Sequence, residues 1–372
     1  MFGLTKRIDW ILFFATLPLL GAGLITMYGF TGEMGFFYRQ LLWIGISLSV
    51  FFGFSFVDFR FLRRTNVIIS LFVVFVGLLS ALFVLGSVFK GAKSWFDLGI
   101  VAFQPSDPMK IVLILTLAKY FSRRHVEIAH FKHILISGLY ALIPFVLVLL
   151  EPDFGVAIIL FFIWFGMILA AGISKKHLSI VFSVGAIAFL IMWSTMLAPY
   201  QKARVLNFLH PLTDIRGSGY NAYQSTIAVG SGQVWGKGVG YGTQSRLKFL
   251  PEYETDFVFA AFAEEWGFIG VMLLFLFFGI VIWRILVNAM LGATNFETLY
   301  GIGLAVFFIT HFTIHIGMNI GLLPVTGTTV AFLSYGGSHL LTEFTGLGIL
   351  MGMRSYARPL SREVQSRVLE IL

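Results

Sequence analysis

The feature that most constrains this chain is a series of long apolar runs that covers most of its 372 residues. Hydrophobic residues make up 58% of the sequence and charged residues only 12%, about half the charged fraction of an ordinary soluble domain. A single water-soluble core of this size cannot enclose 42 phenylalanines. The composition therefore excludes a soluble enzyme, a nucleic-acid-binding protein and a disordered protein, and it predicts a polytopic membrane protein.

The apolar runs have the length of transmembrane helices, about 20 residues each. Strands of an outer-membrane β-barrel would be about half as long and would alternate apolar with polar residues. The sequence predicts an all-α polytopic membrane protein with ten transmembrane helices, forming a single membrane domain over residues 1–372. The runs lie at 8–30, 38–56, 66–88, 106–121, 133–150, 155–173, 178–199, 256–283, 298–322 and 337–353.

Basic residues orient these helices, because short cytoplasmic loops are enriched in lysine and arginine. Alternation from a cytoplasmic Lys6 and Arg7 places fifteen basic residues inside, whereas the short outer loops hold few, chiefly Lys90 and Lys93. Both termini are therefore expected in the cytoplasm, and the net charge of +8 reflects topology rather than nucleic-acid binding. The fifteen are Lys6, Arg7, Arg60, Arg63, Arg64, Arg123, Arg124, Lys132, Lys175, Lys176, Arg284, Arg354, Arg358, Arg362 and Arg367.

Residues 200–254, between helices seven and eight, form a long extracytoplasmic loop in this topology and carry more basic than acidic side chains. Long loops are exempt from the rule that orients short ones, so topology does not explain this charge. Two interpretations remain open: a solvated loop near lipid headgroups, or a site for an anionic, phosphate-bearing ligand. The basic residues are Lys202, Arg204, Arg216, Lys237, Arg246 and Lys248.

Ionisable residues at the edges of the apolar runs are functional candidates, because burying charge in lipid is costly. Asp107 and Lys110 share a helical face and form either a neutralised pair at a helix N-terminus or the mouth of a polar cavity. Glu151 and Asp153 occupy a very short outer turn, where they cap the next helix or face the same cavity. Asp256 opens the eighth helix as a capping residue or as a carboxylate that accepts a proton from a hydroxyl.

Other polar positions lie deeper in the apolar runs or between them. Glu264 and Glu265 point about 100° apart on a helix, so at least one is expected to bond a neighbouring helix. His311 and His315 are one turn apart, but no third zinc ligand is apparent, and packing is the preferred role. Residues 323–338 are too apolar for a free loop and too interrupted for a span, which predicts a re-entrant or cavity-lining segment.

Five motifs in order resemble the SEDS family (shape, elongation, division, sporulation) over the region from helix three to helix ten. None of the motifs is specific alone, but their order and the matching topology are. They are Phe103-Gln104-Pro105-Ser106, Gly242-Thr243-Gln244-Ser245, Phe249-Leu250-Pro251-Glu252, Thr255-Asp256-Phe257-Val258-Phe259 with Glu264-Glu265, and Ser334-Tyr335-Gly336-Gly337-Ser338.

The resemblance implies a peptidoglycan glycosyltransferase that polymerises lipid II into β-1,4-linked glycan strands at the outer leaflet of the bacterial cytoplasmic (inner) membrane. It implies inversion at the anomeric carbon and a class B penicillin-binding protein as partner. The stretches at 95–99 and 242–245 are more similar to RodA, the elongation branch, than to FtsW, the division branch. Lipid II and membrane lipid are then the expected small-molecule partners, and nucleic acid is not.

The same resemblance assigns roles to individual residues. The essential aspartate of the family corresponds to Asp256, which is expected to act as the general base. Asp107 stands where the family usually has glutamate, which leaves the role of its carboxylate open. A divalent cation, Mg²⁺ or Mn²⁺, could help to hold the pyrophosphate, but the sequence identifies no ligands for it. The expected substrate contacts are Lys110, Asp107, Lys202, Arg204, Arg246, Lys248, Gln244, Asp153, Ser334 and Ser338.

Two other functions fit the same pattern of residues. A lipid II flippase would also need a polar cavity and a lipid groove, but it would need access from both leaflets, whereas the distinctive residues here gather on the outer side. A non-catalytic scaffold that activates a penicillin-binding protein would explain the helix surfaces but not the buried ionisable groups.

Overall fold

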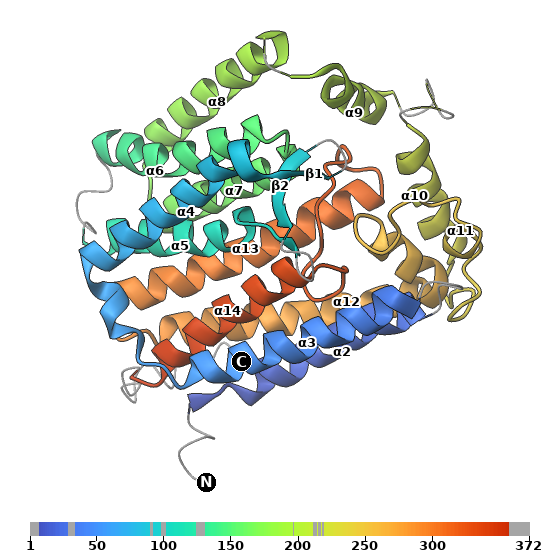
Figure 1. The fold of residues 1–372 in the computed structure, drawn as a ribbon, viewed down its shortest axis with the longest axis horizontal. Helices are drawn as coiled ribbons and strands as arrows, with labels where there is room; N and C mark the ends of the chain where they lie inside the picture. Colours follow the sequence, from blue (N-terminus) through green and yellow to red (C-terminus); the bar gives the residue numbers. More distant parts are fainter. Residues whose placement is uncertain are drawn as a thin grey trace.

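The protein is described by a computed structural model that is predominantly helical (Figure 1). Each of the ten predicted runs corresponds to one helix, and three further helices, α9 to α11, lie between α8 and α12. The structure describes residues 7–28, 34–89, 92–97, 102–123, 131–195, 197–210, 214, 217 and 219–356.

Seven of the described helices are long and apolar enough to cross a membrane, which confirms a polytopic membrane protein. The helices are α2 (Trp10–Tyr28), α3 (Met34–Ser55), α4 (Thr65–Leu85), α5 (Ser106–Ser122), α6 (Phe131–Leu150), α7 (Phe154–Ala170), α8 (Lys175–Thr195), α9 (Pro199–Leu209), α10 (Tyr220–Ser231), α11 (Thr243–Arg246), α12 (Val258–Met290), α13 (Asn295–Asn319) and α14 (Gly337–Arg354), with a 3₁₀ helix, η1, at Phe59–Arg63.

Several helix boundaries follow directly from local chemistry. Thr294 and Glu297 form a reciprocal capping box at the start of α13, which satisfies amides that a helix N-terminus leaves unpaired. The side chain of Asp153 accepts a hydrogen bond from the Val156 amide and so caps α7. Pro199 is the first residue of α9, a position where the missing amide proton costs nothing.

Between α4 and α5 the chain forms a small antiparallel sheet that the sequence analysis did not predict. The strands are β1 (Ser87–Phe89), β2 (Ala92–Asp97) and β3 (Ala102–Phe103), in the order β1-β2-β3. Phe96 pairs with Phe103, and Asp97 pairs with Ala102. The sheet leads directly into α5, so it fixes where the polar start of that helix lies.

The core of the bundle is built around α13, most of whose residues are buried. It packs against α5, α7 and α12, while α14 packs along α3 and α2 along α12. By contrast, α8 has no buried residue and stands at the edge of the bundle (Figure 1). Helices α9, α10 and α11 lie together at one end of the long helices (Figure 1, right).

The buried carboxylate of Asp9, just before α2, links that helix to α12 and α14. Asp9 accepts hydrogen bonds from Arg284 on α12 (2.6 Å), Asn288 (2.7 Å) and Arg354 on α14 (2.9 Å). Burial alone would raise the pKa of Asp9, but the bonds from Arg284 and Asn288 outweigh it and lower the pKa. The cluster joins α2, α12 and α14, and both arginines belong to the set that the sequence predicts to be cytoplasmic.

Helix α12 is broken at Gly267, whose backbone (φ 63°, ψ −167°) is one that only glycine adopts readily. A Cβ at this position would lie 2.2 Å from the backbone nitrogen of Gly236. The freed amide of Phe268 donates to the carbonyl of Gln233 at 2.9 Å, as expected where a second segment enters a kink. The glycine-rich segment before α11, residues 230–242, is therefore hydrogen-bonded to the kink in α12.

Some residues used to predict the topology lie outside the described part of the chain. They are Lys6, Lys90, Arg124, Arg216, Arg358, Arg362 and Arg367, together with the side chain of Lys93.

Candidate active site

Asp256 lies at the end of a tight turn that leads into α12. The carbonyl of Glu252 accepts hydrogen bonds from the amides of Thr255 (3.2 Å), Asp256 (3.0 Å) and Phe257 (3.1 Å). Glu252 itself has a φ of 52°, an uncommon value for a residue with a side chain. The N-cap of α12 is Phe257, so Asp256 is not the capping residue that one interpretation of the sequence suggested.

The turn rests on the irregular segment between α13 and α14, residues 320–336. The Ser334 hydroxyl donates to the carbonyl of Thr255 at 2.9 Å and accepts from the amide of Val330 at 2.9 Å. The amide of Tyr335 donates to the carbonyl of Glu254 at 2.9 Å. Ser334 is therefore buried beside Asp256, with its hydroxyl bonded to the backbone of both segments.

The same segment passes under the Asp256 carboxylate at Gly327. A Cβ at this glycine would lie 3.3 Å from Oδ2 of Asp256, so a side chain here would press on the carboxylate. The following residues are bound to α13: His315 Nδ1 lies 2.7 Å from the carbonyl of Thr328, and His311 Nδ1 lies 3.0 Å from that of Thr329. Both histidines are thus packed in the core.

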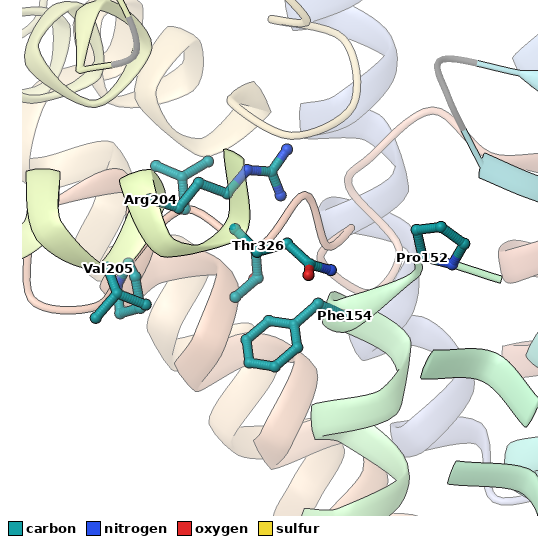
Figure 2. Close-up of a pocket in the computed structure, with 8 residues that line it drawn as sticks. Pro152, Phe154, Arg204, Val205 and Thr326 are labelled. Atoms are coloured by element: carbon teal, nitrogen blue, oxygen red, sulfur yellow. The ribbon is translucent and has the colours of Figure 1, made fainter. Parts of the chain in front are cut away.

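A pocket lies next to this point, between α7, α9 and residues 324–326. Figure 2 shows Arg204 and Val205 of α9 across from Phe154 of α7, with Thr326 between them. Thr326 precedes Gly327, so the pocket and the Asp256 carboxylate adjoin the same short piece of backbone. Arg204 is exposed, and the pocket therefore combines an apolar wall with a cationic side chain.

A second polar cluster lies inside the bundle, where α5 and α14 meet. Lys110 Nζ is 2.8 Å from Oδ1 of Asp107, and both residues are 3% exposed or less. His339 bridges the two helices: its Nδ1 lies 3.7 Å from Oδ1 of Asp107, and its Nε2 lies 2.7 Å from Oε1 of Glu343. The predicted Asp107–Lys110 ion pair is present and is enclosed by protein.

Gln104 connects this cluster to the short turn between α6 and α7. Its side-chain Nε2 donates to Oδ2 of Asp153 at 3.1 Å, and its backbone amide donates to the Ser338 hydroxyl at 3.4 Å. Burial raises the pKa of Asp153, although the Val156 amide bond and the charge of Lys110 oppose this. Asp107, Lys110, Asp153 and Ser338, which the sequence singled out separately, thus belong to one polar network.

The predicted basic contacts are spread over two elements of the long segment. Lys202 and Arg204 are on α9, whereas Arg246 ends α11 and Lys248 follows it. Arg246 and Lys248 are exposed and lie in the stretch that leads into the Asp256 turn. Gln244 is half-buried, and its backbone amide donates to the Glu264 carboxylate at 3.1 Å.

Two buried polar residues join the N-terminal part of α12 to other segments: Glu264, for which such a bond was expected, and Asn319, which the sequence analysis missed. Glu264 is fully buried and accepts from Lys237 Nζ at 2.7 Å and from the Thr243 hydroxyl of α11 at 3.0 Å, which confirms the expected bond to a neighbouring helix. Asn319, at the end of α13, donates to the carbonyl of Asp256. An asparagine in an otherwise apolar helix is a sequence signal that could have identified Asn319, because a buried amide needs hydrogen-bond partners.

Glu151 gives a testable pH dependence. It is 1% exposed, and among the described residues neither carboxyl oxygen has a hydrogen-bond partner. Burial, with a contribution from the charge of Asp153, raises the pKa of Glu151 to about 8. The folded state therefore binds this proton more tightly than the unfolded state, and stability falls as pH rises from about 4.5 to about 8.

We expect Glu151→Gln to flatten this dependence, because the amide stays neutral throughout. The measurement is the midpoint of thermal unfolding in detergent, compared between the two proteins from about pH 5 to about pH 9. An equally steep decline in both proteins over that interval would show that another group is responsible.

Residues 7–358 match the FtsW/RodA/SpoVE family, which is described as a family of cell cycle proteins. Peptidoglycan glycosyltransferase MrdB of Escherichia coli is 36% identical over 294 residues, which are 79% of each chain. Stage V sporulation protein E of Bacillus subtilis is 35% identical over 366 residues, covering 94% of this chain and 98% of that protein.

Solved structures share the fold. A chain of a peptidoglycan synthase complex, described as coordinating polymerization and crosslinking, superimposes with a TM-score of 0.80 at 28% identity, covering 94% of this chain and 98% of that one. Rod shape determining protein RodA of Thermus thermophilus superimposes with a TM-score of 0.71 at 27% identity, covering 95% and 98%.

Proposed function

The chain belongs to the FtsW/RodA/SpoVE family, and on that premise we propose that it is a peptidoglycan glycosyltransferase that polymerises lipid II. Two relatives support this activity: one is named as a peptidoglycan glycosyltransferase, and another belongs to a complex that couples polymerization to crosslinking. The product is a β-1,4-linked glycan strand, made at the outer leaflet of the bacterial cytoplasmic membrane.

The observation that carries this proposal is the position of Asp256 beside a cationic pocket. Its carboxylate lies over Gly327, next to the pocket that Thr326 and Arg204 line. Transfer of a sugar from a pyrophosphate requires a base for the acceptor hydroxyl and a cation for the departing pyrophosphate, and both are present beside this pocket. The apolar side chain of Phe154 lines the same pocket and would contact the lipid part of the donor where it leaves the pyrophosphate.

In the proposed reaction, Asp256 takes the proton from the acceptor's sugar hydroxyl while that oxygen attacks the anomeric carbon of the donor. The bond from this carbon to the pyrophosphate oxygen breaks, and its electron pair leaves with the pyrophosphate. Direct displacement inverts the anomeric centre, so an α-linked donor gives a β-linked product.

Negative charge develops on the departing pyrophosphate, and the nearby cations would stabilise it. Arg204 at the pocket and the exposed Arg246 and Lys248 are the best placed of the predicted contacts. Lys110 is buried against Asp107, so its charge would act from the inner wall. Lys202, Gln244 and Asp153 are the remaining proposed contacts for the sugar and pyrophosphate. Asp107, Ser334 and Ser338 are buried and would support these contacts from within the protein.

A divalent cation, Mg²⁺ or Mn²⁺, is proposed to help hold the pyrophosphate. In the described part of the chain, no group of three or more histidine, aspartate or glutamate side chains is arranged to hold a metal ion. No step of the proposed reaction is therefore assigned to a cation.

We infer that the chain crosses the cytoplasmic membrane ten times, with both termini in the cytoplasm. The seven long apolar helices would be joined by α5, α7 and α14. Residues 200–254 would then lie on the outer side, and residues 323–338 would line the cavity there. The long segment and the Asp256 turn would meet lipid II where its sugar and pyrophosphate are exposed.

The proposed role is cell elongation, with a class B penicillin-binding protein as the partner that crosslinks the strands. MrdB and RodA are among the relatives, and the structural relative in a synthase complex supports a partner of this kind. Stage V sporulation protein E is similar to the same degree, so the comparison of relatives supports the activity more strongly than the cellular role.

The test is to incubate the purified protein with labelled lipid II in detergent and to resolve the products by length. Glycan strands are expected, with longer or more abundant strands when the penicillin-binding protein is added. A detergent micelle has no leaflets, so a flippase would yield no polymer. If the protein yields no strands with or without the partner, yet raises the partner's crosslinking of added glycan strands, the scaffold function is correct instead.

A further inference from the structure

We propose that Asn319 is a positioning residue for Asp256, acting as a capping group for α12 from a different helix. The inference rests on the proposed function, because it concerns the carboxylate assigned there as the base. Asn319 is fully buried at the last residue of α13, and its amide makes hydrogen bonds to both sides of the α12 start.

The amide group of Asn319 joins the two ends of the peptide segment that follows Asp256. Its Nδ2 donates to the backbone carbonyl of Asp256 at 3.0 Å, and its Oδ1 accepts from the backbone amide of Ala260 at 3.1 Å. Nδ2 also donates to the carbonyl of His315, one turn earlier on α13, at 2.8 Å. One side chain therefore fixes the start of α12 relative to α13.

These contacts replace a cap that the sequence of α12 lacks. The N-cap residue, Phe257, has no side chain that could accept a hydrogen bond. Ala260 is the third residue of the helix, and its amide is one that an N-cap oxygen normally satisfies. Asn319 supplies that oxygen from α13, so the amide of Ala260 is satisfied by a neighbouring helix.

A third helix contacts the backbone at the end of α13. The Ser225 hydroxyl of α10 donates to the backbone carbonyl of Asn319 at 2.8 Å. Ser225 is fully buried, and this bond orders the end of α13. Its bond to the side-chain oxygen of Asn319 is longer, at 3.4 Å, so the contacts to α12 depend mainly on the asparagine itself.

The consequence for catalysis follows from the distance over which a base can act. A general base must lie within hydrogen-bond reach of the proton that it takes, and a displacement of about 1 Å can cost about 100-fold in rate. Without Asn319, the Asp256 carbonyl and the Ala260 amide lose their partner and the turn at Asp256 can rotate. Substrate binding, which uses the pocket and the basic side chains, does not depend on these bonds.

The test compares Asn319→Leu, which has a similar volume but no amide, with Ser225→Ala, which loosens the end of α13 but leaves the bonds to α12. Lipid II polymerisation is measured in detergent, with kcat and KM determined separately, together with the midpoint of thermal unfolding. We expect Asn319→Leu to lower kcat about 100-fold with little change in KM. Ser225→Ala is expected to lower the unfolding midpoint while kcat stays near the wild-type value.

Asn319→Asp provides a second readout that a purely structural role would not give, and it serves if the leucine variant does not fold. The new carboxyl can accept from the Ala260 amide at any pH, but it can donate to the Asp256 carbonyl only when protonated. Its kcat relative to wild type is therefore expected to rise as pH falls.

The results distinguish failure of the proposed base from failure of the positioning role. If Asp256→Asn polymerises lipid II normally, the assigned base is wrong, and the positioning role is overturned with it. If Asp256→Asn is inactive but the Asn319 variants keep wild-type kcat, only the positioning role is overturned. A loss of activity that tracks thermal stability equally in the Asn319 and Ser225 variants, with no dependence on pH, also overturns it.

Discussion

Asp256→Asn is expected to lower the rate of lipid II polymerisation about 10²- to 10⁴-fold, the range that general-base catalysis contributes. The asparagine has the same shape, so it can occupy the space over Gly327, but it cannot accept a proton from the acceptor hydroxyl at neutral pH. The backbone bonds that hold residue 256, from Asn319 and to Glu252, do not involve the carboxylate. Folding should therefore be retained.

The measurement is the initial rate of glycan formation by the purified variant, with thermal unfolding and lipid II binding as checks on folding and on the pocket. Glu254→Gln is the matched control, because it removes a carboxylate from the same turn, two residues away. We expect the control to keep most of its activity. Near-wild-type synthesis by Asp256→Asn, or equal inactivation of both variants, would remove Asp256 from its assigned role.

The order of the helices could be predicted from hydropathy because the bilayer demands long apolar segments with internally satisfied backbones. The run predicted at 106–121 corresponds to α5 (Ser106–Ser122), and that predicted at 133–150 corresponds to α6 (Phe131–Leu150). The small sheet before α5 was missed because strands of two to six residues leave no periodic pattern in a sequence. The break at Gly267 was missed because a single glycine inside an apolar run does not by itself indicate a kink.

The candidate site was predictable as a set of residues but not as an arrangement. Asp107 and Lys110 are close in the chain, and their ion pair follows from helical spacing. The bond from Gln104 to Asp153 joins residues 49 positions apart, and that from Asn319 to Asp256 joins residues 63 positions apart. Such contacts depend on the packing of α5, α7, α12 and α13, which a single sequence does not reveal.

Glu264→Leu is expected to destabilise the fold by about 1–3 kcal/mol, the usual cost of leaving buried hydrogen-bond donors without their acceptor. The carboxylate accepts hydrogen bonds from Lys237, from the Thr243 hydroxyl and from the Gln244 amide. These donors lie along the segment that leads through Arg246 to the Asp256 turn. Losing their common acceptor should release that segment and lower polymerisation as well as stability.

A double-mutant cycle with Lys237→Met separates the charge from the rest of the network. Lys237→Met leaves Glu264 buried without its cation, whereas the double variant leaves no unpaired charge, so the double variant should be more stable than the sum of the single effects predicts. Thermal unfolding in detergent gives the stabilities, and limited proteolysis between residues 237 and 248 reports release of the segment. If Glu264→Leu keeps this segment protected and the effects are additive, Glu264 does not anchor it. If Glu264→Leu raises cleavage of this segment and lowers polymerisation, the fully buried Glu264 anchors the segment. That segment contains Arg246 and Lys248 and leads into the Asp256 turn.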